Sequence, residues 1–85
     1  MEIRHVGISS REDRMRVAHS IAERIRAARE LRGITQAELA KRVARFPQLI
    51  SSYECSRVMP PLIAICEIAG AVDLPLDYFF RWGAS

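Results

Sequence analysis

The chain has 85 residues, a hydrophobic fraction of 49% and a formal net charge of +3. That length is enough for one small domain with one modest core, and that hydrophobic fraction excludes wholesale disorder. The charge is uneven, because residues 1–57 are net basic whereas residues 58–85 carry one basic side chain against three acidic ones. The basic part is suited to a polyanion, although ordinary solvated charge would produce the same balance.

Several classes of function are disfavoured because the residues that their chemistry needs are not suitably spaced. Cys55 and Cys66 form no CxxC pair and the two histidines lie far from them in sequence, so we expect neither a zinc site nor, in a reducing cytosol, a disulfide. The spacing supports no pairing of a serine or cysteine nucleophile with a histidine base, so we expect no enzyme. No cofactor and no small-molecule ligand are expected either.

No targeting or membrane segment is expected. The N-terminus is polar and lacks the apolar stretch of a signal peptide. The most apolar run, residues 58–72, is interrupted by Pro60, Pro61 and Glu67, so it is not expected to span a bilayer. These features predict a cytoplasmic protein with no membrane partner.

The first third of the chain is expected to hold an arm and helical structure. Residues 1–9 lack helical periodicity and predict an extended or mobile arm. Ser10 with Asp13 has the pattern of a helix start, and so does Ser20 with Glu23. The sequence leaves open whether this region is one helix or two, bent near Ser20. The expected apolar line comprises Met15, Ala18, Ile21, Ile25 and Ala28, and it ends before Gly33, a natural residue just beyond a helix.

Two short helices are predicted next. Thr35 is a good N-cap, and Glu38 three residues later completes a capping box. Pro47 is suited to the first position of the following helix, in which Ile50 and Tyr53 should point inward. A short polar helix supported by the preceding one fits the major groove of DNA. The residues expected to be buried in the first helix are Leu39, Ala40 and Val43, and those expected to face outward in the second are Pro47, Gln48, Ser51 and Ser52.

The last third predicts a loop, a helix over residues 61–72 and a short helix from Pro75. The expected core residues are Leu62, Ile65, Cys66, Ile68, Ala69, Val72, Leu74, Leu76 and Phe79. Because the 61–72 helix is apolar nearly all round, we expect it to contact a partner as well as the core. A cluster of aromatic side chains near the end of the chain supports the same expectation. The residues expected at a dimer interface are Ile63, Gly70, Tyr78, Phe80 and Trp82.

The order of these elements resembles the Xre-type, lambda-repressor-like helix-turn-helix family of regulators. The resemblance rests on IAERIRAARELRGITQAELA at residues 21–40, on Ile50, on the pair Tyr53 and Glu54, and on Pro60 followed by an apolar helix. It implies an all-α fold, a compact bundle of about five helices with an extended or additional N-terminal helix. The expected divisions are an N-terminal segment over residues 1–19, the helix-turn-helix domain over 20–80 and a tail over 81–85.

The resemblance also implies roles for individual residues. Arg29 and Glu54 match an ion pair that, in the family, ties the first helix to the end of the recognition helix. Gln36 matches a phosphate-binding glutamine of related phage repressors, and Gln48 matches a base-reading one, since glutamine pairs with adenine. The other expected DNA contacts are Arg45, Pro47, Ser51, Ser52 and Arg57.

The corner between the two motif helices departs from the family pattern. Ala44 stands where glycine commonly takes a left-handed conformation, which would cost alanine about 1–2 kcal/mol. Arg45 stands where an apolar residue is usual, and Phe46 where a hydroxyl N-cap is usual. We expect Phe46 to pack inward and Arg45 to turn toward DNA. Ser56 also replaces a usual glycine, which leaves the backbone of its loop open.

The sequence therefore predicts a sequence-specific transcriptional regulator that binds double-stranded DNA. It is expected to act as a homodimer on a palindromic operator, with residues 47–54 in the major groove. The alternative is an antitoxin-like interaction module, in which the same fold binds a different protein through its apolar helix and aromatic tail. The unusual corner at residues 44–46 keeps this alternative open.

Overall fold

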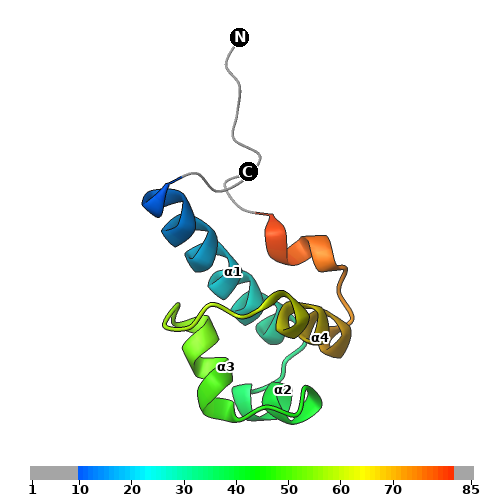
Figure 1. Cartoon of the computed structure of the whole chain (residues 1–85). Coiled ribbons are helices and arrows are strands. Elements are labelled where there is room, and N and C mark those ends of the chain that lie inside the picture. Colours follow the sequence, from blue (N-terminus) through cyan, green and yellow to red (C-terminus); the bar gives the residue numbers. More distant parts are fainter. Residues whose placement is uncertain (1–9, 82–85) are drawn as a thin grey trace.

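The longest element, α1 (Arg11–Leu31), is one continuous helix in the computed structural model, which describes residues 10–81 (Figure 1). The Ser10 hydroxyl caps it by accepting a hydrogen bond from the Asp13 backbone N–H at 3.0 Å. Ser20 starts no second helix and lies inside α1. The question that the sequence left open is therefore decided in favour of one helix. The arm predicted for residues 1–9 lies outside the described residues.

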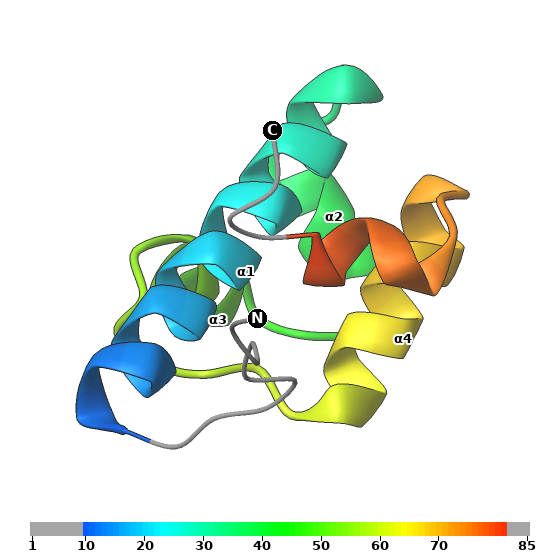
Figure 2. The same cartoon turned by 90° about the horizontal axis from the view of Figure 1, so that it is seen from above.

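Four further elements follow: α2 (Gln36–Arg42), α3 (Pro47–Glu54), α4 (Leu62–Val72) and the 3-10 helix η1 (Leu76–Phe80). There is no strand within residues 10–81, and the expected all-α bundle of about five helices is confirmed. In Figure 1, α2 and α3 lie together at the lower end of the molecule, and Figure 2 shows η1 between α1 and α4. No helix in the described range is long and apolar enough to cross a bilayer.

One hydrophobic core joins all five elements. Its largest fully buried side chains are Phe79, Ile21, Ile25, Leu39, Ile50, Ile65, Ile68 and Val72. In α1 the prediction for Met15 is wrong, because this side chain is 62% exposed and Val17 is buried instead. Residues four apart share a helix face, so Val17 continues the line through Ile21 and Ile25 whereas Met15 does not.

α4 buries one side and exposes the other, and this corrects two predicted core positions. Leu62 is 62% exposed and Cys66 is also exposed, while Ala64, which was not predicted, is buried. The buried side of α4 comprises Ala64, Ile65, Ile68, Ala69 and Val72. Leu62 and Cys66 lie one turn apart on the opposite side, so they cannot share this core. The prediction of Leu76 as a core residue is also wrong, because this side chain, at the start of η1, is 40% exposed.

Two arginines bind the C-terminal end of α4. Arg32 donates from Nε to the Val72 carbonyl at 2.7 Å and from Nη2 to the Asp73 carbonyl at 3.0 Å. Arg42 donates from Nη1 to the Ala71 carbonyl at 3.0 Å. The last carbonyls of a helix lack intrahelical partners and carry partial negative charge, so guanidinium groups stabilise them. These bonds connect the ends of α1 and α2 to α4.

Each of the four α-helices within residues 10–81 ends in a left-handed turn. One or two residues beyond each helix the backbone φ is positive, at 67° in Gly33, 56° in Ala44, 62° in Ser56 and 55° in Asp73. After α2, the Ala44 N–H donates to the Lys41 carbonyl at 3.3 Å and the Arg45 N–H to the Ala40 carbonyl at 2.9 Å. This is the pair of bonds of a Schellman motif. Ala44 and Ser56 thus keep the backbone that glycine has in the family, although a Cβ strains it.

Replacing Ala44 by glycine should raise the free energy of unfolding by about 0.5–1 kcal/mol. Glycine relieves left-handed strain of about 1–2 kcal/mol and loses part of this gain to backbone entropy. Gly33→Ala is the matched control, since nothing lies within 4 Å of its added Cβ and only the backbone strain acts; it should lower stability by about 1 kcal/mol. Urea denaturation measures both changes. Destabilisation by Ala44→Gly would contradict the left-handed corner.

Candidate nucleic-acid interface

α3 is held against the core by one of its sides. Ile50 is 0% exposed and Tyr53 is 3% exposed, as the sequence predicts. Leu49 is half-buried and packs against the same core. Because the buried residues follow one side of the helix, the other side is left to the solvent.

The outward side of α3 carries small polar and apolar groups. Pro47 and Gln48 are exposed, and Ser51 and Ser52 are half-buried. Glu54 is the one acidic residue of α3, and its side chain is only 3% exposed. No carboxylate on the exposed side of α3 would therefore repel a phosphate backbone.

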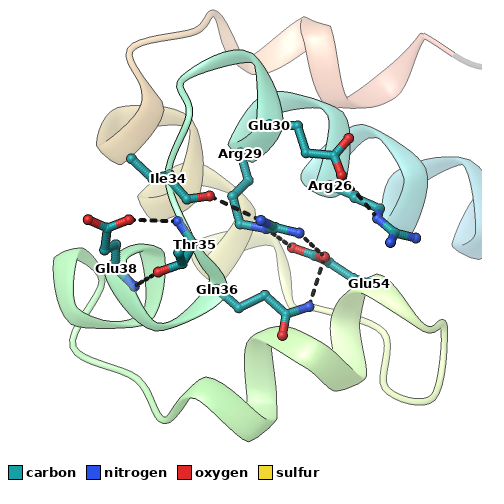
Figure 3. Close-up of polar contacts among 8 residues, drawn as sticks. All are labelled: Arg26, Arg29, Glu30, Ile34, Thr35, Gln36, Glu38 and Glu54. Carbon is teal, nitrogen blue, oxygen red and sulfur yellow. Dashed lines mark hydrogen bonds and ion pairs between the residues drawn. The ribbon is translucent and has the colours of Figure 1, made fainter.

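Glu54 forms a bidentate ion pair with Arg29 of α1, shown in Figure 3. The Arg29 Nε lies 2.8 Å from Glu54 Oε2, and the Arg29 Nη2 lies 3.0 Å from Glu54 Oε1. Arg29 also donates from Nη1 to the Ile34 carbonyl at 3.0 Å. The ion pair expected from the family is therefore present, and it ties the end of α3 to α1 and to the loop that precedes α2.

Gln36 joins this network from the first position of α2. Its Nε2 donates to Glu54 Oε1 at 3.0 Å (Figure 3). The hydrogen bond that Arg29 itself donates to Glu54 raises the pKa of Arg29 above its ordinary value, so the guanidinium stays charged at any physiological pH. A glutamine amide has two N–H donors, so one is used inside the protein and the other is left for an outside acceptor.

The predicted capping box is present at the start of α2 (Figure 3). The Glu38 N–H donates to Thr35 Oγ1 at 3.0 Å, and the Thr35 N–H donates to Glu38 Oε1 at 2.7 Å. The bond from the Thr35 backbone lowers the pKa of Glu38, which is therefore ionised at neutral pH beside the positive end of the helix. This cap fixes where α2 begins and thereby positions Gln36.

The corner between α2 and α3 is arranged opposite to the expectation. Phe46 is 78% exposed rather than packed inward. Arg45 is half-buried and points to α4, where its Nη2 lies 2.6 Å from Glu67 Oε1. The physical reason is the left-handed turn at Ala44, which brings Arg45 to Glu67 and so directs the next side chain away from the core. The expected inward packing of Phe46 is therefore wrong, and Arg45 is turned toward α4 rather than outward.

Five arginines donate hydrogen bonds to carboxylates or carbonyls elsewhere in the described part of the protein. Arg57 differs, because it lies three residues beyond the end of α3, is exposed, and makes no side-chain hydrogen bond or ion pair with residues 10–81. Arginines with carboxylate or carbonyl partners on another element are Arg24, Arg29, Arg32, Arg42 and Arg45. Of the expected DNA contacts, the structure thus brings Gln48, Ser51 and Ser52 onto one helix, with Arg57 at its end.

The matching family model decides which family this is. A model described as helix-turn-helix matches residues 25–79, which include α2, α3 and α4. The chain belongs to the Xre-type helix-turn-helix family. The family model and the arrangement of α2, α3 and α4 thus agree on a helix-turn-helix domain.

Two individual proteins are similar to this helix-turn-helix protein. The crystal structure of hypothetical transcription factor NHTF from Neisseria has a TM-score of 0.75 and 20% identity, covering 93% of this chain and 87% of that one, so it shows the same fold. Endothelial differentiation-related factor 1 homolog of Danio rerio is 33% identical over 61 residues, or 72% of this chain. The chain spans 42% of the length of that relative.

The residues expected at a dimer interface lie in different surroundings. Ile63 is 63% exposed and Gly70 is exposed, both on the outward side of α4. Tyr78 and Phe80 are half-buried in η1 and pack against the core, with the Arg24 guanidinium 4.9 Å from the centre of the Tyr78 ring. Trp82 lies outside the described residues. Within the described part, Ile63 and Gly70 are therefore the members most open to a partner.

Sequence reasoning missed how far the exposed apolar side of α4 extends. It forms a stripe of residues next to one another on the helix, which we name the α4 stripe: Leu62, Ile63, Cys66 and Gly70. The i, i+4 spacing of Leu62, Cys66 and Gly70 was the available signal. It was obscured because the buried side of α4 is equally apolar.

Glu54→Ala should lower the free energy of unfolding by about 3 kcal/mol. Removing one partner strands the Arg29 charge, and buried pairs lose about 3–5 kcal/mol in this way; Arg29 retains 13% exposure, which favours the lower end. Glu30→Ala is the control, because its pair with Arg26 is about 60% exposed and its loss should cost under about 0.5 kcal/mol. Equal urea midpoints for the two variants would contradict a structural role for the Arg29–Glu54 pair.

Proposed function

We propose that this protein is a sequence-specific transcriptional regulator that binds a palindromic operator as a homodimer, with α3 in the major groove. The observation that carries the proposal is the outward side of α3, which presents Gln48, Ser51 and Ser52, has no exposed carboxylate and is fixed by the Arg29–Glu54 pair. A helix held at its far end by such a pair presents its side chains in a defined direction. A groove-reading helix needs this property.

Base recognition is assigned first to Gln48. It is exposed at the second position of α3, and recognition helices contact base edges with their N-terminal residues. A glutamine can form two hydrogen bonds with adenine N6 and N7 in the major groove. Ser51 and Ser52 follow on the same helix and supply hydroxyl groups to bases or phosphates.

Phosphate contacts are assigned to Gln36 and Arg57, which lie at the two ends of the motif. The second amide N–H of Gln36 remains for a phosphate oxygen after the first binds Glu54. Arg57 has an exposed guanidinium without a partner in the described part of the chain. Such contacts set the position of α3 on the duplex and carry no sequence information directly.

Dimerisation is assigned to the α4 stripe. One short helix makes few base contacts, so a two-fold dimer is expected to place two copies of α3 about 34–36 Å apart, in half-sites about 10–10.5 bp apart. Ile63 supplies exposed apolar area, and nothing lies within 4 Å of a Cβ built on Gly70, so a second helix could approach closely there. Exposed apolar stripes of this kind mark interfaces.

An antitoxin-like role would use the same α4 stripe for a different protein. That alternative predicts a stable complex with another chain and no preference among DNA sequences. Enrichment of oligonucleotides from a random pool separates the two functions. The regulator proposal fails if no sequence is enriched at any salt concentration.

Gln48→Ala and Arg57→Ala should weaken DNA binding in different ways. Loss of the Gln48 amide should weaken the selected operator by about 1–3 kcal/mol and leave random DNA unaffected, because only base readout is removed. Loss of the Arg57 charge should weaken all sequences alike and flatten the slope of log K against log salt by about one. Fluorescence anisotropy over a salt series measures both. Identical effects of the two variants would contradict these assignments.

Ile63→Glu should weaken the dimer and leave the monomer fold intact. The side chain is already exposed, so monomer stability should change by less than about 0.5 kcal/mol, whereas a charge inside an apolar interface is costly. Leu31→Glu is the control, because Leu31 is equally exposed, at 61%, at the end of α1. Sedimentation equilibrium measures the association. A wild-type protein that is monomeric both free and on DNA would contradict the dimer.

A further inference from the structure

Phe46, in the α2–α3 corner, has been assigned no role so far. At 78% it is the most exposed large apolar side chain within residues 10–81. An aromatic ring left in water forgoes a large gain from burial, and exposed aromatic residues are enriched where proteins contact partners. The exposure is maintained by the fold, because the Phe46 carbonyl accepts the first hydrogen bonds of α3, from the N–H groups of Leu49 at 3.0 Å and Ile50 at 3.4 Å.

The direction of Phe46 follows from its neighbours. Arg45 is fixed to Glu67 on α4, and the Phe46 backbone is extended at φ −79° and ψ 144°. Successive side chains of an extended segment point to opposite sides, so Phe46 is directed away from α4. The N-terminal end of α3, which begins at Pro47, lies at the lower edge of the molecule in Figure 1. Phe46 therefore stands beside Pro47 and Gln48 at the outer end of α3.

The chemistry of this corner selects an apolar group as its ligand. Neither the Phe46 ring nor the Pro47 ring has a hydrogen-bond donor, and Pro47 also lacks a backbone N–H. These two side chains are therefore poorly suited to phosphate oxygens or to the polar edges of bases. In the major groove, thymine presents a 5-methyl group that phenylalanine contacts well.

We propose that Phe46, supported by Pro47, recognises the 5-methyl group of a thymine in each half-site of the operator. The inference rests on the proposed function, because it requires the N-terminal end of α3 to enter the major groove. Recognition helices contact bases with that end. Phe46 thus adds an apolar specificity determinant beside the hydrogen-bonding one assigned to Gln48.

The test compares thymine with deoxyuridine, which differs only by the absence of the methyl group. The operator is first selected from a random pool, and each thymine is then replaced singly by deoxyuridine. With the wild-type protein, one position per half-site should lose about 3–10-fold in affinity, as expected for one methyl group removed from an apolar contact. With Phe46→Ala, the intact operator should bind more weakly, and deoxyuridine at that position should cause no further loss.

Met15→Ala is the matched control, since Met15 is also an exposed apolar residue, at 62%, but lies near the start of α1. It should keep the wild-type response to deoxyuridine, and both variants should keep the wild-type melting temperature. Equal deoxyuridine losses in wild type and Phe46→Ala would overturn the inference, as would the absence of any loss in wild type. If no sequence is enriched from the pool, the proposed function itself fails, and this result is distinct from the other two.

Discussion

The ion pair between Arg29 and Glu54 is the constraint on which the presentation of α3 depends. Its two hydrogen bonds join the same guanidinium to the two oxygens of one carboxylate, at 2.8 and 3.0 Å. A bidentate pair of this kind fixes both the distance between α1 and the end of α3 and the orientation of α3. Such a pair adds little net stability compared with an apolar replacement, because both ions lose hydration. Its effect is geometric: with Ile50 and Tyr53 buried, it leaves α3 one orientation in which its polar side faces outward.

The arginines of this protein show why net charge is a weak guide to a binding surface. A basic composition is consistent with a polyanion as partner, yet Arg32 and Arg42 bind carbonyls at the end of α4 and Arg45 binds Glu67. Their charges stabilise helix ends and connections between helices. The electrostatic attraction of the proposed interface then depends on fewer groups, Arg57 among them, together with the concealment of Glu54.

Two locally unfavourable features meet at the corner between α2 and α3. Ala44 has a left-handed backbone, and Phe46 exposes an aromatic ring to water. Each departs from what would best stabilise the isolated fold, and such departures concentrate at sites that carry function. The left-handed turn also explains why Phe46 is exposed, because it directs Arg45 toward Glu67 on α4 and leaves Phe46 facing outward.

The sequence by itself determined the helices and several of their ends, as at Thr35, Pro47 and Gly33, because caps and apolar spacing act between residues three or four apart. Together with the family resemblance, it also predicted the Arg29–Glu54 pair. Only the tertiary structure decided which side chains of the equally apolar faces of α4 are buried, and how Arg45 and Phe46 are turned. Arg45 meets Glu67 across 22 positions of sequence, and no local pattern encodes a contact between side chains that only folding brings together.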